Sequence, residues 1–170
     1  LHQKKYDKAE QIGNTAIGTN PGSDRLFYAM GILNNRKDNF GKAKNYLEAA
    51  IRIAPTKSKY FVQLAKSHLY FNQVKQAQAL LHHSLKLDPN NESALQLKSL
   101  LEQQTGDSQI AQFLADKALK LSPENAHTHL IKATLNWKNK NFEAAESHLE
   151  TAVQLQPQNQ DILALWLESR

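Results

Sequence analysis

The chain has 170 residues, 41% of them hydrophobic and 22% charged, and its formal net charge at pH 7 is +5. That length corresponds to about one domain, and the composition is ordinary for a chain that buries an apolar core. The sequence contains no Cys, which excludes disulfides, thiolate metal sites and a cysteine nucleophile. No apolar run approaches the roughly 18 residues that indicate a membrane-spanning helix.

The prolines of this chain stand at a constant interval of 34 residues, each in a similar phrase such as LKLDPNN at 85–91. They are Pro21, Pro55, Pro89, Pro123 and Pro157. Alanine stands twelve residues before every proline, at Ala9, Ala43, Ala77, Ala111 and Ala145. A fixed period of this length indicates stacked supersecondary units.

Each proline follows a segment with helical apolar spacing, and proline cannot continue a helix. Two residues after each proline stand Ser23, Lys57, Asn91, Asn125 and Asn159. The Ser and Asn side chains among them can cap the free amides of a following helix. We therefore expect two helices per period, joined by short polar turns. In chain order the expected helices are residues 6–19, 24–37, 40–53, 58–71, 74–87, 92–104, 108–121, 126–139, 142–155 and 160–170.

One helix pair cannot bury its apolar face alone, so neighbouring pairs must stack, and small residues in the alanine columns let helices approach closely. The expected fold is all-α, a single solenoid of stacked antiparallel helix pairs over residues 1–170. Its expected parts are the second helix of a partial repeat, four full repeats, and the first helix of a further or capping repeat. The corresponding ranges are 1–23, then 24–57, 58–91, 92–125 and 126–159, then 160–170.

The 34-residue unit resembles the tetratricopeptide repeat, which has small residues at positions 8, 20 and 27 and Pro at position 32. Position 8 holds Gly31, Ala65, Ser99 and Ala133. The resemblance covers essentially the whole chain. It implies a right-handed superhelix and a non-enzymatic scaffold for protein–protein interaction. In that family the first helices line a concave groove that accepts an extended peptide or a partner helix.

The first helices of the third and fourth repeats depart from this pattern. Position 7, usually Leu in the family, is Lys98 and Lys132. The apolar stripe is carried there by other residues, namely Leu97, Leu101, Ile131 and Leu135. We therefore expect these two helices to be rotated or less deeply packed.

The resemblance also implies which side chains face the groove. The candidate partner-binding residues are Arg25, Tyr28, Ile32, Arg36, Lys59, Val62, Lys66, Tyr70, Gln96, Leu100, Gln103 and Trp137. The first two repeats place cations beside tyrosine rings, with Arg25, Arg36, Lys59 and Lys66 near Tyr28 and Tyr70. Charge and rings together suit an acidic or carboxylate-bearing segment. The alternative is that these are solvated charges on the surface.

Charge is distributed unevenly along the chain. Residues 1–91 carry 14 Lys and Arg against 6 Asp and Glu, whereas residues 92–170 carry 7 against 10. Chaperone-binding members of the family hold a terminal carboxylate with Lys at position 5 and Asn at position 9 of their first repeat. Those positions are Tyr28 and Ile32 here, so that clamp is not expected.

Other classes of function have weaker support. Neither His82 with His83 nor His127 with His129 places both rings on one helix face, so no metal site is expected, and we interpret His68 as a packed, hydrogen-bonded residue. No glycine-rich phosphate loop, GxSxG or HExxH motif is present. Neither catalysis nor a cofactor is therefore expected. The net charge of +5 suggests nucleic-acid binding as another class of function. The net acidic balance of residues 92–170 does not favour that function.

Two questions about the ends of the chain stay open. The first residues lack the apolar stretch of a secretory signal, and the compartment is unknown, with cytoplasm and bacterial periplasm both open. Near the other end, an apolar face is formed by Ile162, Leu163, Leu165, Trp166 and Leu167. We expect either further repeats or another domain to follow, or self-association through this face. The alternative function is that this chain is the repeat segment of a larger enzyme or envelope-assembly protein and positions another domain of it.

Overall fold

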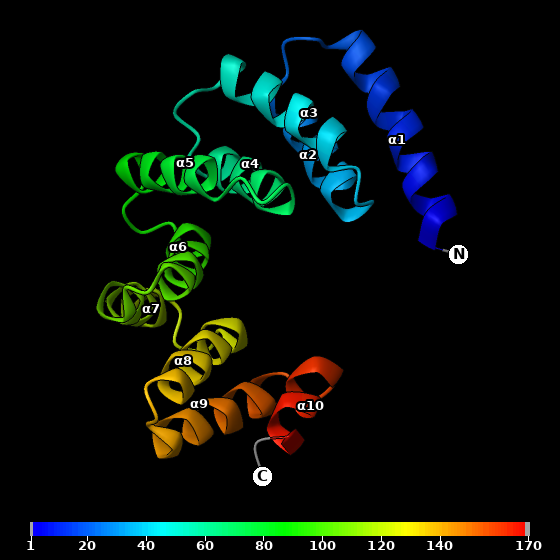
Figure 1. The fold of residues 1–170 in the computed structure, drawn as a ribbon. Coiled ribbons are helices and arrows are strands. Elements are labelled where there is room, and N and C mark those ends of the chain that lie inside the picture. The colour runs from blue at the N-terminus through cyan, green and yellow to red at the C-terminus, as the bar shows by residue number, and fades with distance from the viewer. Residues whose placement is uncertain (1, 169–170) are drawn as a thin grey trace. The chain divides into compact units, whose positions relative to one another are not determined.

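The computed structural model describes residues 2–168, and within that range it contains ten α-helices and no strand (Figure 1). The helices are α1 His2–Thr19, α2 Asp24–Arg36, α3 Phe40–Ile53, α4 Ser58–Tyr70, α5 Val74–Leu87, α6 Glu92–Thr105, α7 Ser108–Leu121, α8 Ala126–Lys138, α9 Phe142–Leu155 and α10 Gln160–Glu168. The expected all-α helical repeat is confirmed. Every helix after α1 begins at the expected residue, whereas α1 begins at His2 rather than near residue 6. The last two residues of the predicted final helix lie outside the described residues.

Three of the expected helix caps are formed. Ser23 Oγ accepts from the Leu26 amide at the start of α2, and Asn125 Oδ1 accepts from the amide of the third residue of α8. Asn159 Oδ1 likewise accepts from the Ile162 amide in α10. Lys57 makes no side-chain cap, as expected for a residue without an acceptor. A cap of this kind contributes about 1 kcal/mol to a helix.

The turn inside each full repeat uses a left-handed backbone at the same repeat position. Asp38, Asn72, Gly106 and Lys140 have φ values of 58°, 55°, 103° and 59°. Asn, Asp and Gly adopt this conformation most readily because of their short polar side chain or missing Cβ. Lys140 has neither property, so in the fourth repeat the tertiary packing of the two helices imposes the turn.

The helices form two compact units, unit 1 with α1–α5 (Leu1–Asn91) and unit 2 with α6–α10 (Glu92–Arg170). In unit 1, α2 pairs with α3 and α4 pairs with α5, while α3 contacts α4 and α1 contacts α2. In unit 2 the pairs are α6 with α7 and α8 with α9, and α10 contacts α9. The boundary between the units coincides with a repeat boundary and with the change from a basic to an acidic balance of charge.

Small residues lie where the helices of each unit approach most closely. Ala43, Ala77 and Ala111 have no exposed surface, and Ala145 is also buried. Ala9, the member of the same column in α1, is exposed. The alanine columns therefore mark close helix approach in the four full repeats.

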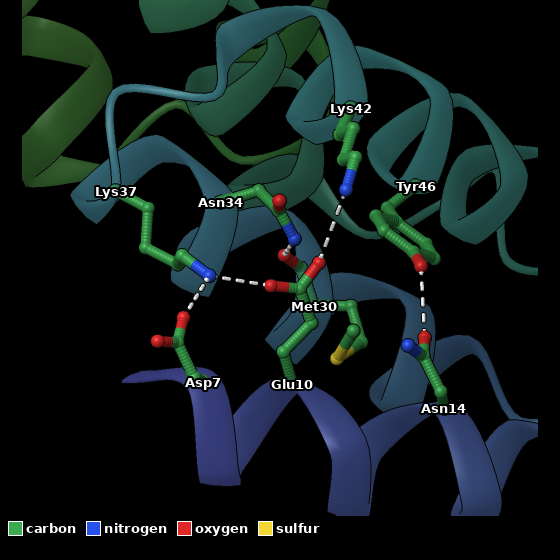
Figure 2. A network of polar contacts seen from close by, with 8 residues as sticks. All are labelled: Asp7, Glu10, Asn14, Met30, Asn34, Lys37, Lys42 and Tyr46. Atoms are coloured by element: carbon green, nitrogen blue, oxygen red, sulfur yellow. Dashed lines mark hydrogen bonds and ion pairs between the residues drawn. The ribbon is translucent and has the colours of Figure 1, made fainter. Parts of the chain in front are cut away.

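Polar contacts connect α1 to the pair that follows it (Figure 2). Lys37 Nζ donates to Asp7 Oδ1 at 2.8 Å and to Glu10 Oε2 at 2.5 Å. Tyr46 Oη of α3 donates to Asn14 Oδ1 at 3.0 Å. The hydrogen bond from Lys37 lowers the pKa of the Glu10 carboxyl. Two carboxylates of α1 thus share the Lys37 ammonium, and Glu10 Oε1 also lies 3.4 Å from Lys42 Nζ of α3.

For the first helix of the fourth repeat we expected either a rotation or shallower packing. The shallower packing is wrong, and the rotation stays a prediction. Helix α8 buries residues on most of its circumference, and Lys132 itself is only 9% exposed. Its Nζ lies 2.7 Å from Asp116 Oδ1 and donates to Gln112 Oε1 at 2.6 Å. Lysine can occupy this apolar column because the long stem packs inside and α7 supplies both partners of the ammonium.

Candidate partner-binding surface

Helices α2 and α4 lie side by side in unit 1 and are bridged by side chains. Asn35 Nδ2 of α2 donates to the Gln63 carbonyl at 3.4 Å, and Ser67 Oγ of α4 donates to Asn35 Oδ1 at 2.8 Å. These bonds occupy the amide of Asn35 and align the two first helices. We refer to the solvent-facing side chains of this pair as the α2–α4 surface.

The amino-terminal halves of α2 and α4 carry two stacked rings under a cation. Tyr28 and Tyr60 have ring centroids 4.5 Å apart, and Lys59 Nζ lies 5.1 Å and 5.9 Å from these two centroids. The Tyr60 hydroxyl donates to Asp24 Oδ2 at 2.5 Å. Burial, assisted by that hydrogen bond, raises the pKa of Tyr60 to about 12, so the hydroxyl keeps its proton at neutral pH. The two uncharged tyrosine rings therefore form a surface over which the Lys59 ammonium lies.

The carboxy-terminal halves of the same helices border a cavity of about 360 Å³. Its lining residues are Ile32, Asn35, Arg36, Phe40, Gln63 and Lys66. The Phe40 ring stacks on Tyr70, with centroids 3.7 Å apart. Lys66 reaches solvent, but the atoms around its ammonium desolvate it, and this burial lowers the pKa of Lys66. We refer to this hollow as the α2–α4 cavity.

The predicted cations of unit 1 all lie on the α2–α4 surface. Arg25, Arg36, Lys59 and Lys66 are exposed, and Tyr70 is 61% exposed. Tyr28 and Ile32 are half-buried. Val62, in contrast, is only 1% exposed and therefore offers no surface to a partner.

The predicted residues of unit 2 have more varied positions. Gln96 is buried, and its Nε2 donates to Thr128 Oγ1 at 2.7 Å, so it has a structural role within the unit. Leu100 packs against the core between α7 and α8, and the side chain of Gln103 is half-buried. Trp137 is 49% exposed and forms an edge contact with Phe142. The side chains of unit 2 do not form a basic patch.

Two residues of the surface were missed by the sequence prediction. Phe40 begins α3 and Gln63 lies inside α4, yet both line the α2–α4 cavity. The positions that the resemblance assigns to the groove all lie on first helices, so a residue that begins a second helix is not found that way. Tyr6 and Phe142 occupy the same repeat position as Phe40, and this recurring aromatic was the signal available for it.

The C-terminal apolar face lies partly inside unit 2. Ile162 is buried against Ala126 and Ala152, while Leu165 and Leu167 are exposed. Self-association through α10 stays a prediction. Within residues 2–168 no helix is long and apolar enough to cross a membrane.

The histidines follow their expected roles only in part. His68 is buried and its Nδ1 lies 2.6 Å from Gln73 Oε1, which confirms a packed, hydrogen-bonded residue. His129 of α8 meets His148 of α9, with the two Nδ1 atoms 3.0 Å apart. This pair was missed because its members belong to different helices. No group of three or more possible metal ligands occurs among the described residues.

The His148 ring is expected to make the stability of unit 2 sensitive to acid. Burial, with the nearby His129 and Lys132, lowers the pKa of His148, and Asp116 opposes this. Because the unfolded ring takes up its proton near the ordinary value of about 6.5, the stability is fully present above that pH. It is lost as the pH falls further, because the unfolded chain then binds more protons.

The measurement is the free energy of urea unfolding at pH 7.5 and pH 5.5, followed by circular dichroism. The His148→Gln variant is expected to lose less stability between these pH values than the wild-type chain loses. His82→Gln, at an exposed position of α5, is the matched control. An equal loss in all three proteins would contradict the role of His148.

The comparison with protein families identifies the class of this chain. Two family profiles, both described as Tetratricopeptide repeat, match residues 24–57 and 97–160. Together they cover more than half of the 170 residues. The chain therefore belongs to the tetratricopeptide repeat family, whose members are generally non-catalytic scaffolds that bind protein or peptide partners. No curated protein matches the sequence.

Solved structures with the same fold share little sequence with this chain. TTC0263, a tetratricopeptide repeat protein of Thermus thermophilus, superposes with a TM-score of 0.85 at 14% identity, covering 99% of this chain and 92% of its own. YrrB, described as having an unusual peptide-binding site, has a TM-score of 0.67 at 19% identity, with 96% and 84% covered. PilF of Pseudomonas aeruginosa has a TM-score of 0.78 at 18% identity, with 98% and 76% covered. At these identities the likeness shows the fold.

Proposed function

We propose that the chain is a scaffold that captures an acidic segment of a partner protein on the α2–α4 surface. The observation that carries this proposal is a set of exposed cations that form no ion pair within the chain. Among the described residues, no hydrogen bond or ion pair occupies the side chains of Arg25, Arg36 or Lys66, and Lys59 contacts only tyrosine rings. An acidic segment would supply the missing counter-charges.

Three other cations of unit 1, Lys37, Lys42 and Lys44, do have carboxylate partners. Lys37 is held between Asp7 and Glu10 (Figure 2), and Lys44 lies 3.9 Å from Glu48. Asp7, Glu10 and Glu48 are therefore paired with lysines that are not among the candidate cations. Asp24, the first residue of α2, accepts from the Tyr60 hydroxyl and lies close enough to Arg25 for the two charges to attract each other. Among the described residues, no ion pair offsets the positive charges of Arg36, Lys59 and Lys66.

The tyrosine rings add contact area to this charge. Tyr28 and Tyr70 are anchored by ring stacking on Tyr60 and Phe40, so they lose little side-chain entropy when a partner covers them. Rings beside Arg and Lys are typical of the residues that dominate binding energy at protein interfaces. The described peptide-binding site of YrrB supports a peptide as the ligand class.

Charge reversal at Lys59 and Lys66 is the direct test. The double variant Lys59→Glu/Lys66→Glu is expected to bind an acidic partner at least about tenfold more weakly, because about 1.4 kcal/mol of lost attraction has that effect. The probe is a blocked, fluorescent peptide of alternating Asp and Gly, titrated by fluorescence anisotropy. The affinity of the wild-type chain is expected to fall as salt is added, because exposed charges are screened.

The control is Lys75→Glu/Lys86→Glu, which makes the same change of net charge at exposed positions of α5. It is expected to bind the probe nearly as well as the wild-type chain, and circular dichroism is expected to be unchanged in both variants. Equal weakening by the two double variants would show that net charge, rather than the α2–α4 surface, attracts the peptide.

A further inference from the structure

The α2–α4 cavity is lined by half-buried apolar side chains, which we call its apolar floor, and by exposed cations. Ile32 and Phe40 supply the apolar part, and Arg36 and Lys66 supply the cations. The Gln63 side chain also lines the cavity, and among the described residues it has no hydrogen-bond partner. The amide of Asn35, in contrast, is occupied by the bridge between the helices.

We propose that this cavity binds one apolar residue of the partner protein, and that this residue is directly adjacent to an Asp or Glu in the partner's sequence. The apolar side chain would cover Ile32 and Phe40, and the neighbouring carboxylate would bind Arg36 and Lys66. This inference rests on the proposed function, because it assigns a recognition rule to the same surface.

The carboxylate and the apolar side chain of such a ligand each remove a separate unfavourable free-energy contribution that is present in the unbound chain. The ammonium of Lys66 is partly desolvated without a counter-ion, which disfavours its charged form, and a carboxylate relieves that cost. Arg36 can meet a carboxylate through two parallel hydrogen bonds. The apolar floor gains from being covered at about 25 cal/mol per Å² of buried apolar surface.

A ligand with only one of the two features fits less well. A neutral apolar side chain would remove more water from Lys66 and Arg36 without supplying an opposite charge, which is unfavourable. A carboxylate without an apolar neighbour would leave Ile32 and Phe40 uncovered. The cavity therefore favours the combination over either part.

Three blocked peptides of equal length test this rule. They are acetylated and amidated Gly-Ser peptides with a central Leu-Asp, Gly-Asp or Leu-Asn pair, titrated into the ¹⁵N-labelled chain and followed by NMR. The Leu-Asp peptide is expected to bind about tenfold more tightly than either of the other two. Its largest shifts are expected at α2, α4 and the start of α3.

Variants locate the contact. Arg36→Gln and Lys66→Gln are each expected to reduce the preference for Leu-Asp over Leu-Asn, because each removes a cation that faces the carboxylate. Arg52→Gln, an exposed cation of α3, is the matched control and is expected to keep the preference. Raising the pH is expected to weaken Leu-Asp binding in the wild-type chain, and less so in Lys66→Gln, because the ammonium of Lys66 loses its proton.

The outcomes separate this inference from the proposed function. If Gly-Asp binds as tightly as Leu-Asp and Lys59→Gln weakens both, the acidic surface stands and the rule for the cavity is wrong. If none of the peptides shifts α2 or α4, both are wrong. A peptide with a free C-terminal Leu and no Asp that binds more tightly than Leu-Asp would also overturn the rule, because the carboxylate recognised would then be that of the chain end.

Discussion

Replacing Gly31 by Ala is expected to destabilise unit 1 by about 1 to 3 kcal/mol, the usual cost of overpacking a filled core. A Cβ at Gly31 would lie 2.5 Å from Leu47 Cγ and 2.7 Å from its Cδ2. Leu47 has no exposed surface, so its side chain has no solvent space into which it can move. The measurement is the free energy of unfolding in urea.

A double-mutant cycle identifies the cause of this loss. Leu47→Ala alone is expected to cost about 2 to 5 kcal/mol, because it leaves a cavity. In Gly31→Ala/Leu47→Ala the added methyl occupies part of that space, so the double variant is expected to be more stable than the sum of the single effects by about 1 kcal/mol or more. Additive effects would mean that the two residues do not compete for space.

Gly41→Ala is the control for helix propensity. No atom lies within 4 Å of the position that its Cβ would take, and the residue is exposed in the first turn of α3. Ala is a better helix former than Gly, so a small gain of roughly 0.5 kcal/mol is expected. A loss at Gly41 similar to that at Gly31 would contradict the role of close packing.

Removing the carboxylate of Glu92 is expected to destabilise unit 2 by about 2 to 3 kcal/mol, because several donors would lose their acceptor. Glu92 Oε2 accepts from Ser122 Oγ at 2.6 Å, and its Oε1 accepts from Gln96 Nε2 at 3.0 Å. Asn125 Nδ2 donates to the same Oε1. Glu92 therefore ties the start of α6 to the turn before α8, and Glu92→Ala is the variant to measure by urea unfolding.

Two further variants separate charge from packing at this position. Glu92→Gln keeps one acceptor oxygen but replaces the other by a donor, so an intermediate loss of stability is expected. Glu124→Ala, at an exposed position of the same turn, is expected to change the free energy of unfolding by less than about 0.5 kcal/mol. If Glu92→Ala unfolds at the same urea concentration as Glu124→Ala, the hydrogen bonds of Glu92 do not contribute to stability.

Most of the secondary structure could be predicted from the sequence because its signals are local. Proline ends a helix by its own geometry, and a Ser or Asn side chain caps a helix within three residues. The period of 34 residues repeats these signals in phase, so one misread segment would have been corrected by the others. The alanine columns likewise indicated where helices meet, since only small side chains permit close approach.

The composition of the candidate surface was predicted in part. The cations Arg25, Arg36, Lys59 and Lys66 are exposed as expected, because a charged side chain stays hydrated unless a partner compensates its burial. Val62 was wrongly expected to be available to a partner, because a repeat position gives an average orientation and a small apolar residue turns inward when neighbouring helices leave room for it.

The remaining features depend on side chains that are far apart in the chain. Nothing in the segment around Lys132 shows that Asp116 and Gln112, on the second helix of the preceding repeat, accept from its ammonium. The same holds for His129 beside His148 and for Phe40 at the edge of the α2–α4 cavity. Local propensity and periodicity select the helices and the order in which they stack, because they act within a few residues. Burial, ion pairing and the shape of a binding cavity arise only when separate helices are brought together, because each depends on distances that the packed chain sets.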